Sequence, residues 1–242
     1  MNTSHGTIEV SGIRVEVVRK SIKNLHLSVH PPEGRVRVSA PTRTDDEAVR
    51  LAVVSKLRWI RRHQQTFAAQ PRQSPREMVG GESHYFLGRR YRLRVLEQVG
   101  PNNLRLKGNS ELTLRVRPGT GRDKREQVLN DWYRQHMKSI IPNLIEKWRP
   151  VIGVHVADWG VKKMKTRWGS CNIRDRRVWL NLELAKKPPH CLEYVLVHEM
   201  VHLLERHHND RFKTFMDGFM PQWRLYRDEL NQAPLAHDEW EY

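Results

Sequence analysis

Two histidines and a glutamate in the second half of the chain have the spacing of a metal site. His198 and His202 are four residues apart, so on an α-helix both imidazoles leave the same face, about one turn apart. That spacing suits two ligands of one tetrahedral zinc ion, with Glu199 beside the open coordination position. Apolar residues at helical spacing surround the motif, and Pro188-Pro189 open the segment where a helix tolerates proline. The pattern predicts a metal-binding helix; the alternative is a helix whose histidines are half-exposed and hydrated.

A zinc ion that acts on a substrate normally has three protein ligands and keeps its fourth position for water. His208 is the best candidate for the third ligand. Six more residues of straight helix would carry it about 9 Å along the axis, so we expect the helix to stop near Arg206 or His207. Asn209-Asp210 then caps a second helix that carries an apolar stripe. Other residues remain open as the third ligand: His207, Glu205 on the first helix, Asp217 and Glu229.

The segment Arg167–Cys171 lies between two predicted strands and allows two interpretations. In the first, it borders the active site and aligns an extended peptide by main-chain pairing, so that Arg167, Trp168 and Ser170 are candidate substrate-binding residues. In the second, Trp168 packs in the core and Arg167 pairs with an acidic side chain. Cys171 has no CxxC partner, which favours a small buried thiol over a fourth ligand or a redox switch.

The predicted elements follow one another in the order of an α+β protein. Alternating apolar residues predict strands within residues 8–40, and the segment from Thr44 begins a helix. That helix carries Val49, Val53, Leu57 and Ile60 on one side. Strands are predicted at 84–96, 103–108 and 111–117, then a long helix from Gly121 to Trp148 that is interrupted or kinked near Pro142, then strands at about 154–164 and 177–183.

A polar stretch from Gln70 to Gly81, rich in proline and glycine, predicts a loop between two parts of the chain. The first part, residues 1–75, is expected to be a β-rich subdomain with a helix. The second part, residues 76–242, is expected to contain the metal helix. No internal repeat is visible in the sequence.

Composition limits the class of protein. The net charge is +16, and a protein this basic commonly meets a polyanion, so non-specific contact with nucleic acid is expected unless the charge serves only solubility. Two cysteines are too few for a disulfide framework. No apolar run is long enough to span a membrane, and no secretion signal is visible, so we expect a cytoplasmic protein without a membrane partner.

At this point the sequence resembles the YgjP-like zinc metallopeptidases, which are related to the SprT-type and minigluzincin proteases. The motifs that carry the resemblance are Arg167-Trp168-Gly169-Ser170-Cys171, Val178-Trp179-Leu180-Asn181-Leu182, His198-Glu199-Met200-Val201-His202, and His208 followed by Phe212. The resemblance extends into the N-terminal half, and it implies a zincin-like helical core with a small mixed sheet. It further implies that His198, His202 and His208 hold one zinc ion and that Glu199 is the general base. One departure is Asn209-Asp210, where the family more often has a serine.

These observations support three functional hypotheses. The first is a zinc-dependent peptidase, in which Glu199 takes a proton from the water that attacks the peptide bond of a peptide or protein substrate. The second is a metal-dependent nucleotide pyrophosphohydrolase, although no P-loop or acidic metal cluster supports it. The third is a DNA-associated protease that acts on DNA-bound proteins, as SprT-type relatives suggest.

Overall fold

The computed structural model describes residues 3–30, 34–69, 76–164 and 167–232. Its contacts divide the chain into two units, Met1–Gln73 and Ser74–Ala233. The predicted boundary after residue 75 and residues 70–75 of the predicted loop lie outside the described residues. Strands and helices occur in both units, so the predicted α+β class is confirmed. No helix among the described residues has the length and apolar character that crossing a membrane requires.

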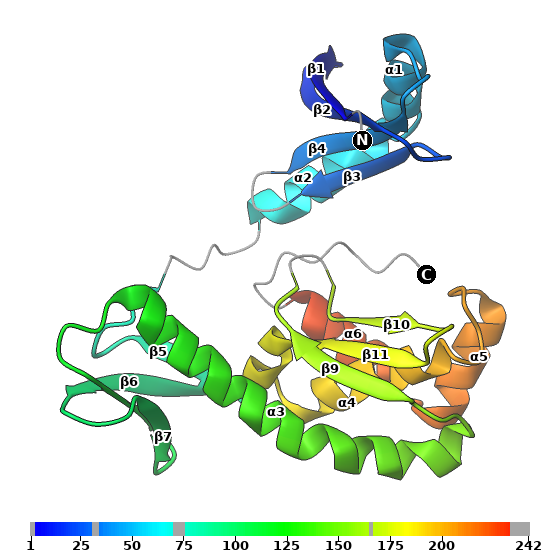
Figure 1. Cartoon of the computed structure of the whole chain (residues 1–242). Helices are drawn as coiled ribbons and strands as arrows, with labels where there is room; N and C mark the ends of the chain where they lie inside the picture. The colour runs from blue at the N-terminus through cyan, green and yellow to red at the C-terminus, as the bar shows by residue number, and fades with distance from the viewer. Residues whose placement is uncertain (1–2, 31–33, 70–75, 165–166, 233–242) are drawn as a thin grey trace. The chain divides into compact units, whose positions relative to one another are not determined.

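The first unit contains a four-stranded mixed sheet. Its strands are β1 (Ser4–Val10), β2 (Ile13–Lys20), β3 (His26–His30) and β4 (Arg35–Pro41), in the spatial order β1-β2-β4-β3 (Figure 1). The central pair, β2 and β4, is parallel, and the two outer pairs are antiparallel. Because successive side chains point to opposite faces of a strand, Val15, Val17, Val36 and Val38 bury one face of the central pair.

The helix predicted from Thr44 onward is in fact two helices, α1 (Asp46–Ser55) and α2 (Leu57–Ala69). Asp45 is the N-cap of α1, and its side chain accepts a hydrogen bond from Ala48 N at 2.7 Å. Lys56 is the C-cap of α1, and its N–H donates to Val53 O, three residues back, at 3.1 Å. The apolar residues that the sequence placed on one helix face still share one core with the sheet: Val49, Val53, Leu57 and Ile60.

The second unit begins with another four-stranded sheet. Its strands are β5 (Ser83–Phe86), β6 (Arg89–Glu97), β7 (Asn103–Lys107) and β8 (Glu111–Val116), in the order β5-β6-β8-β7. The single strand predicted at 84–96 is therefore wrong, since the chain turns at Leu87 and Gly88 to form a hairpin. Both turn residues have positive φ, 49° and 78°, which is the backbone of the tight turns that match the twist of paired strands.

The two sheets repeat one topology, although the sequence shows no repeat. Each sheet starts with an antiparallel hairpin, pairs its second and fourth strands in parallel, and adds its third strand antiparallel to the fourth. The hairpin turns also agree: Ser11 and Gly12 have φ of 51° and 77°, close to the values at Leu87 and Gly88. The two sheets therefore share a strand order that the residue types do not reveal.

A single long helix, α3 (Arg122–Ile152), follows the second sheet (Figure 1). It continues through Pro142 and ends four residues beyond the predicted end at Trp148, so the predicted interruption is wrong. Gly153 ends it in the left-handed conformation, and its N–H bonds to Arg149 O at 2.9 Å. A stripe of buried side chains at helical spacing holds the helix in place: Tyr133, Met137, Ile141, Ile145 and Trp148.

The remaining elements of the second unit are a three-stranded sheet and the helices that pack on it. The strands are β9 (Asp158–Lys162), β10 (Gly169–Asn172) and β11 (Arg177–Asn181), in the order β10-β11-β9. The strand β10 lies in a segment that was predicted to be a connection between strands. The helices are the 3₁₀ helix η1 (Leu182–Lys186), α4 (Pro189–Val201), α5 (Asp210–Phe219) and α6 (Trp223–Gln232). The central helix is α4, which contacts β10, β11, α3, α5 and α6 (Figure 1).

Candidate metal centre

The helix that carries the histidine motif is buried on nearly all sides. Pro189 occupies its first turn, where a backbone N–H has no partner within the helix. Farther along, His198 is 0% exposed and Glu199 is 2% exposed. Ionisable groups at this depth are costly unless they have specific partners. The half-exposed, hydrated alternative therefore does not fit His198.

The helix α4 ends at Val201, earlier than the predicted end near Arg206 or His207. His202 is its C-cap, and the next two N–H groups bond to carbonyls three residues back, at 3.0 and 2.9 Å. Such bonds tighten the last turn of a helix. Glu205 consequently lies in the following turn, and not on the helix as predicted.

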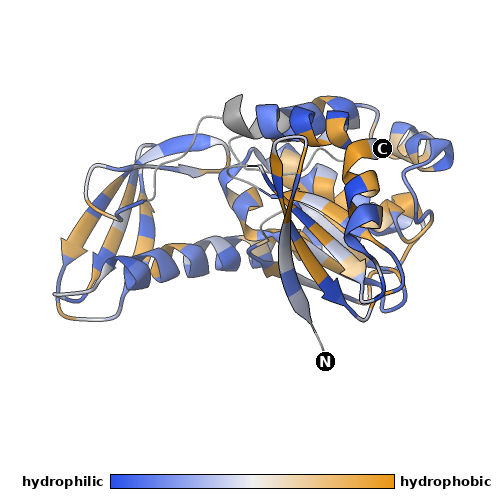
Figure 2. Cartoon of the chain, turned by 90° about the horizontal axis from the view of Figure 1, so that it is seen from above, coloured by the Kyte–Doolittle hydropathy of each residue, from blue (hydrophilic) through white to orange (hydrophobic). Residues whose placement is uncertain are grey.

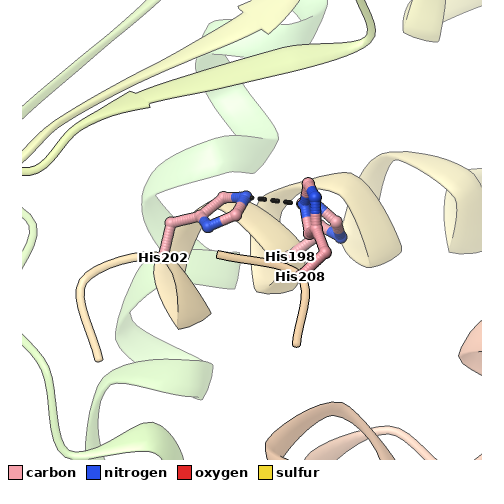
Figure 3. Close-up of side chains that lie close together, drawn as sticks. All are labelled: His198, His202 and His208. Atoms are coloured by element: carbon pink, nitrogen blue, oxygen red, sulfur yellow. Dashed lines mark hydrogen bonds between the residues drawn. The ribbon is translucent and has the colours of Figure 1, made fainter. Parts of the chain in front are cut away.

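His208 approaches the other two histidines from the segment between α4 and α5. Its Nε2 lies 3.0 Å from Nε2 of His198 and 3.0 Å from Nε2 of His202 (Figure 3). Asn209 caps α5, and its side chain accepts a hydrogen bond from Phe212 N at 3.0 Å, which fixes the chain direction just after His208. The structure thus brings together the three imidazoles that the sequence singled out.

One aromatic ring supports all three imidazoles. Phe212, which is 0% exposed, has its ring centroid 4.9 Å from that of His198, 4.8 Å from that of His202 and 4.9 Å from that of His208. Tight packing limits the rotamers of side chains that surround it. Phe212 therefore holds the imidazoles in their convergent orientation.

The other candidates for a third ligand stay outside this group of described residues. Glu205 accepts a hydrogen bond from His207 N at 3.2 Å, while His207 itself is exposed. Asp217 pairs with a guanidinium of α6. Glu229 lies 2.6 Å from His190 Nε2, at the start of α4.

The charge state and spacing of the three histidines fit a zinc ion. Burial, together with the charges of the other two histidines, lowers the pKa of His198 well below its usual value, and burial lowers the pKa of His202. Neutral imidazoles are the form that binds metals. The Nδ1–H of His202 donates to Glu205 O at 3.1 Å, which leaves its Nε2 lone pair for a ligand role. Three Nε2 atoms that converge at this spacing can all bind one cation placed between them. Tetrahedral zinc separates its nitrogen ligands by roughly 3.3–3.4 Å, close to the observed spacing.

Glu199 lies against the backbone of β10. A Cβ built on Gly169 would lie only 2.5 Å from Glu199 Oε1, so a side chain at position 169 would displace the carboxylate. Burial raises the pKa of Glu199 to about 8, against the opposing effect of the positive charge of Arg167. A carboxyl group with a pKa near neutrality can both accept and release a proton at the pH of the cell.

The other residues of the segment Arg167–Cys171 have different environments. Trp168 is 1% exposed and packs in the interior, as the second interpretation of this segment holds. Arg167 is exposed, and Ser170 and Cys171 are half-buried on β10. Burial raises the pKa of the Cys171 thiol to about 12, and the charge of Glu199 adds to the effect, so the thiol stays protonated. Among the described residues, β10 pairs on one side only, with β11, and its other edge is open.

Asn181 is a buried residue with a structural role that was not predicted from the sequence. Its Nδ2 donates to Arg167 O at 2.7 Å and to Met164 O at 3.0 Å, and its N–H donates to Trp168 O at 2.8 Å. Asn181 is 0% exposed, so these bonds form away from water, where they are costly to break. They fix the backbone that leads into β10. An asparagine at the end of an apolar strand was the available sequence signal.

A cavity of about 730 Å³ borders the three histidines on the side of His202. Apolar side chains and two guanidinium groups line it, and neither guanidinium has an ion-pair partner among the described residues. The lining residues are Cys171, Asn172, Ile173, Arg174, His202, Leu203, Leu204 and Arg206. The arrangement can hold an anionic group close to the candidate metal ligands. Arg174 and Arg206 are not among the site residues predicted from the sequence.

Comparisons with known proteins identify one matching family and one similar solved structure. A family model of the YgjP-like metallopeptidase domain matches residues 23–233. No curated protein matches the sequence. Among solved structures, the metallopeptidase zymogen of Pyrococcus abyssi abylysin aligns with a TM-score of 0.35 and 16% identity, covering 37% of this chain and 90% of that chain.

Proposed function

Because the chain belongs to the YgjP-like metallopeptidase family, as its motifs predicted, we propose that it hydrolyses peptide bonds with one zinc ion and with Glu199 as the general base. The observation that carries the proposal is the convergence of three Nε2 atoms, with His208 3.0 Å from both His198 and His202. These three residues hold the ion. A zinc ion in such a site supplies Lewis acidity, which lowers the pKa of a water molecule and polarises a carbonyl group.

Glu199 moves the protons of the reaction. It follows His198 directly on α4, and it is buried next to Gly169. Its carboxylate takes a proton from the attacking water and then passes that proton to the amine that leaves. Burial raises the pKa of this carboxylate, which makes it a stronger proton acceptor than a solvated glutamate.

The open edge of β10 binds the peptide. An extended chain can add to an exposed strand edge through main-chain hydrogen bonds, without regard to side-chain identity. Gly169 on this strand contacts Glu199, so a peptide paired with β10 lies beside the general base. Ser170 on the strand and Arg167 just before it are the side chains best situated to contact substrate, whereas Trp168 supports them from the interior.

The cavity beside His202 selects the substrate side chain. Its apolar residues suit the methylene groups of a side chain, and Arg174 and Arg206 suit a carboxylate at the end of that side chain. The proposal therefore includes a preference for an acidic residue near the cleaved bond.

The same two arginines provide the observation that favours the second candidate, a metal-dependent nucleotide pyrophosphohydrolase, because guanidinium groups also bind phosphates. The two activities separate in one assay. Zinc-loaded protein is incubated in parallel with an unfolded protein and with nucleoside triphosphates, and peptide fragments and pyrophosphate are measured. Release of pyrophosphate without fragments would replace the peptidase proposal.

The decisive variant is Glu199→Gln, which keeps the shape of the side chain and cannot accept a proton. We expect this variant to retain one zinc per chain and to lose peptide hydrolysis by at least about a hundredfold. Elemental analysis and peptide turnover measure the two properties separately. Undiminished turnover contradicts the general-base role, and loss of zinc indicates instead that Glu199 is a ligand.

A further inference from the structure

The sheet β5-β6-β8-β7 has a solvent face on which positive charge gathers. Residues that share this face are defined by the strand register, in which Arg90 lies across from Tyr85, Arg92 from Glu111, and Arg105 from Thr113. The basic residues of the face are Arg90, Arg92, Arg94, Arg105, Lys107 and Arg115. Its acidic residue is Glu111. This set is called the basic sheet face.

The opposite face of the sheet is the one that packs in the core. Leu93, Leu112 and Leu114 on that face are at most 1% exposed, and the helix α3 contacts β7 and β8. Hydrophobic and hydrophilic residues accordingly alternate along the strands of this sheet in Figure 2. On the basic sheet face, by contrast, every arginine of β6 is exposed. The face is therefore available to a partner as far as the described residues show.

The charges on this face are nearly unpaired within the described residues. Arg94 is 4.0 Å from Glu111, at the outer limit of an ion pair, and Glu111 also accepts a hydrogen bond from Thr113 Oγ1 at 2.8 Å. Arg125, which lies outside this face, has by contrast a close ion pair: its guanidinium nitrogen is 2.6 Å from a carboxylate oxygen of Glu97. Like charges held side by side repel one another, and a bound anion removes that repulsion.

We propose that the basic sheet face binds single-stranded nucleic acid. The arginines of β6 occur at every second residue, so their Cα atoms are about 6.8 Å apart, a spacing that lets each meet a different phosphate of an extended strand. Five of the six cations are arginines, whose planar guanidinium groups bind phosphate through paired hydrogen bonds.

A further residue of the same face suits a nucleic acid better than an acidic protein. Tyr85 is 40% exposed beside Arg90, and an exposed aromatic ring on a sheet surface can stack on a base. The carboxylate side chains of an acidic protein have no flat ring that could stack on Tyr85. Binding at this face is separate from peptide hydrolysis and does not depend on the metal centre.

The test measures binding of a labelled oligo(dT) of about 20 nucleotides to the full chain over a salt series. In the test variant, Arg90→Gln, Arg92→Gln and Arg94→Gln are combined. In the control variant, Arg50→Gln, Arg134→Gln and Arg149→Gln are combined, which removes the same charge from arginines that already face a carboxylate. Each phosphate contact on a single strand contributes about 0.7 to the slope of log affinity against log salt. We expect the test variant to lose about tenfold or more in affinity and about 2 in slope, while the control stays near wild type.

A second variant tests the stacking residue. Tyr85→Leu is expected to weaken binding about fivefold or more without changing the salt slope, because stacking involves no counterion. Equal losses in the test and control variants would show that only net charge matters and would overturn the proposal. Binding of duplex DNA or of poly-glutamate as tight as that of oligo(dT) would overturn the assignment to single strands or to nucleic acid, respectively.

Discussion

Gly169 and Glu199 are 30 positions apart in sequence, yet a methyl group on the first would lie 2.5 Å from the carboxylate of the second. The contact joins the edge strand β10 to the helix α4. The strand that is proposed to bind substrate therefore lies directly beside the proposed general base. Any side chain at position 169 would require the carboxylate of Glu199 to move.

Gly169→Ala is therefore expected to reduce peptide hydrolysis by about a hundredfold or more while zinc stays bound, because a small displacement of a catalytic group has effects of that size. Turnover of a labelled peptide and elemental analysis measure the two effects. Gly218→Ala is the matched control, since a Cβ there meets nothing within 4 Å. Full activity in the Gly169 variant would mean that the carboxylate can move without loss.

His208→Ala is expected to weaken zinc affinity strongly, because two remaining ligands hold zinc poorly. His207→Ala is the control, because its side chain is exposed and only its N–H bonds to Glu205. Competition with a chelator of known affinity gives both constants. Wild-type affinity in the His208 variant, with loss in a Glu205→Ala variant, would assign the third ligand to the carboxylate.

The cavity beside His202 leads to a prediction about substrate choice. Wild-type enzyme is expected to cleave a peptide with glutamate near the bond about tenfold faster, in kcat/KM, than the same peptide with glutamine, since a charged hydrogen-bonded partner is worth at least about 1.4 kcal/mol. Arg206→Glu is expected to reverse the preference toward lysine. If the wild-type enzyme cleaves the glutamate and glutamine peptides at the same rate, the cavity does not select the substrate side chain. The peptidase proposal itself would be unaffected.

The hairpin turns of the two sheets form a matched pair for a stability test. Gly12 and Gly88 have φ of 77° and 78°, so alanine at either position costs about 1–2 kcal/mol of backbone strain. A Cβ on Gly88 would also lie 2.8 Å from Pro188 Cγ, at the start of α4, whereas a Cβ on Gly12 meets nothing within 4 Å. Denaturant unfolding should show the larger loss for Gly88→Ala, and only this variant should bind zinc more weakly. Equal effects of the two substitutions would show that the contact with Pro188 is unimportant.

The sequence predicted the metal-binding helix and the start of α5 well, because both depend on local signals. Pro189 and a four-residue histidine spacing define α4, and the Asn209 side chain caps α5 whatever surrounds it. The end of α4 at Val201 was not predictable, because no glycine or proline follows it and the turns after it are stabilised by backbone hydrogen bonds. Likewise, Leu87 has a positive φ that leucine rarely adopts, so the β5-β6 turn had a weak signal.

The other features that the sequence did not predict depend on contacts between segments that are distant in the chain. The sequence contains nothing to indicate that Gly169 touches Glu199, since only the fold brings β10 to α4. The strand β10 itself is four residues long and pairs through backbone groups, so its side chains carry little strand pattern. Asn181 is similar, because its partners are carbonyls 14 and 17 residues earlier.

The two sheets share one strand order and one turn backbone, but their hairpin turns have different surroundings. A Cβ on Gly12 would meet no described atom within 4 Å, whereas Leu87 and Gly88 donate backbone hydrogen bonds to η1 and a Cβ on Gly88 would meet Pro188 at the start of α4. The turn that closes β5 and β6 therefore supports the start of α4, so a change in this distant hairpin can reach the helix that carries the candidate metal ligands.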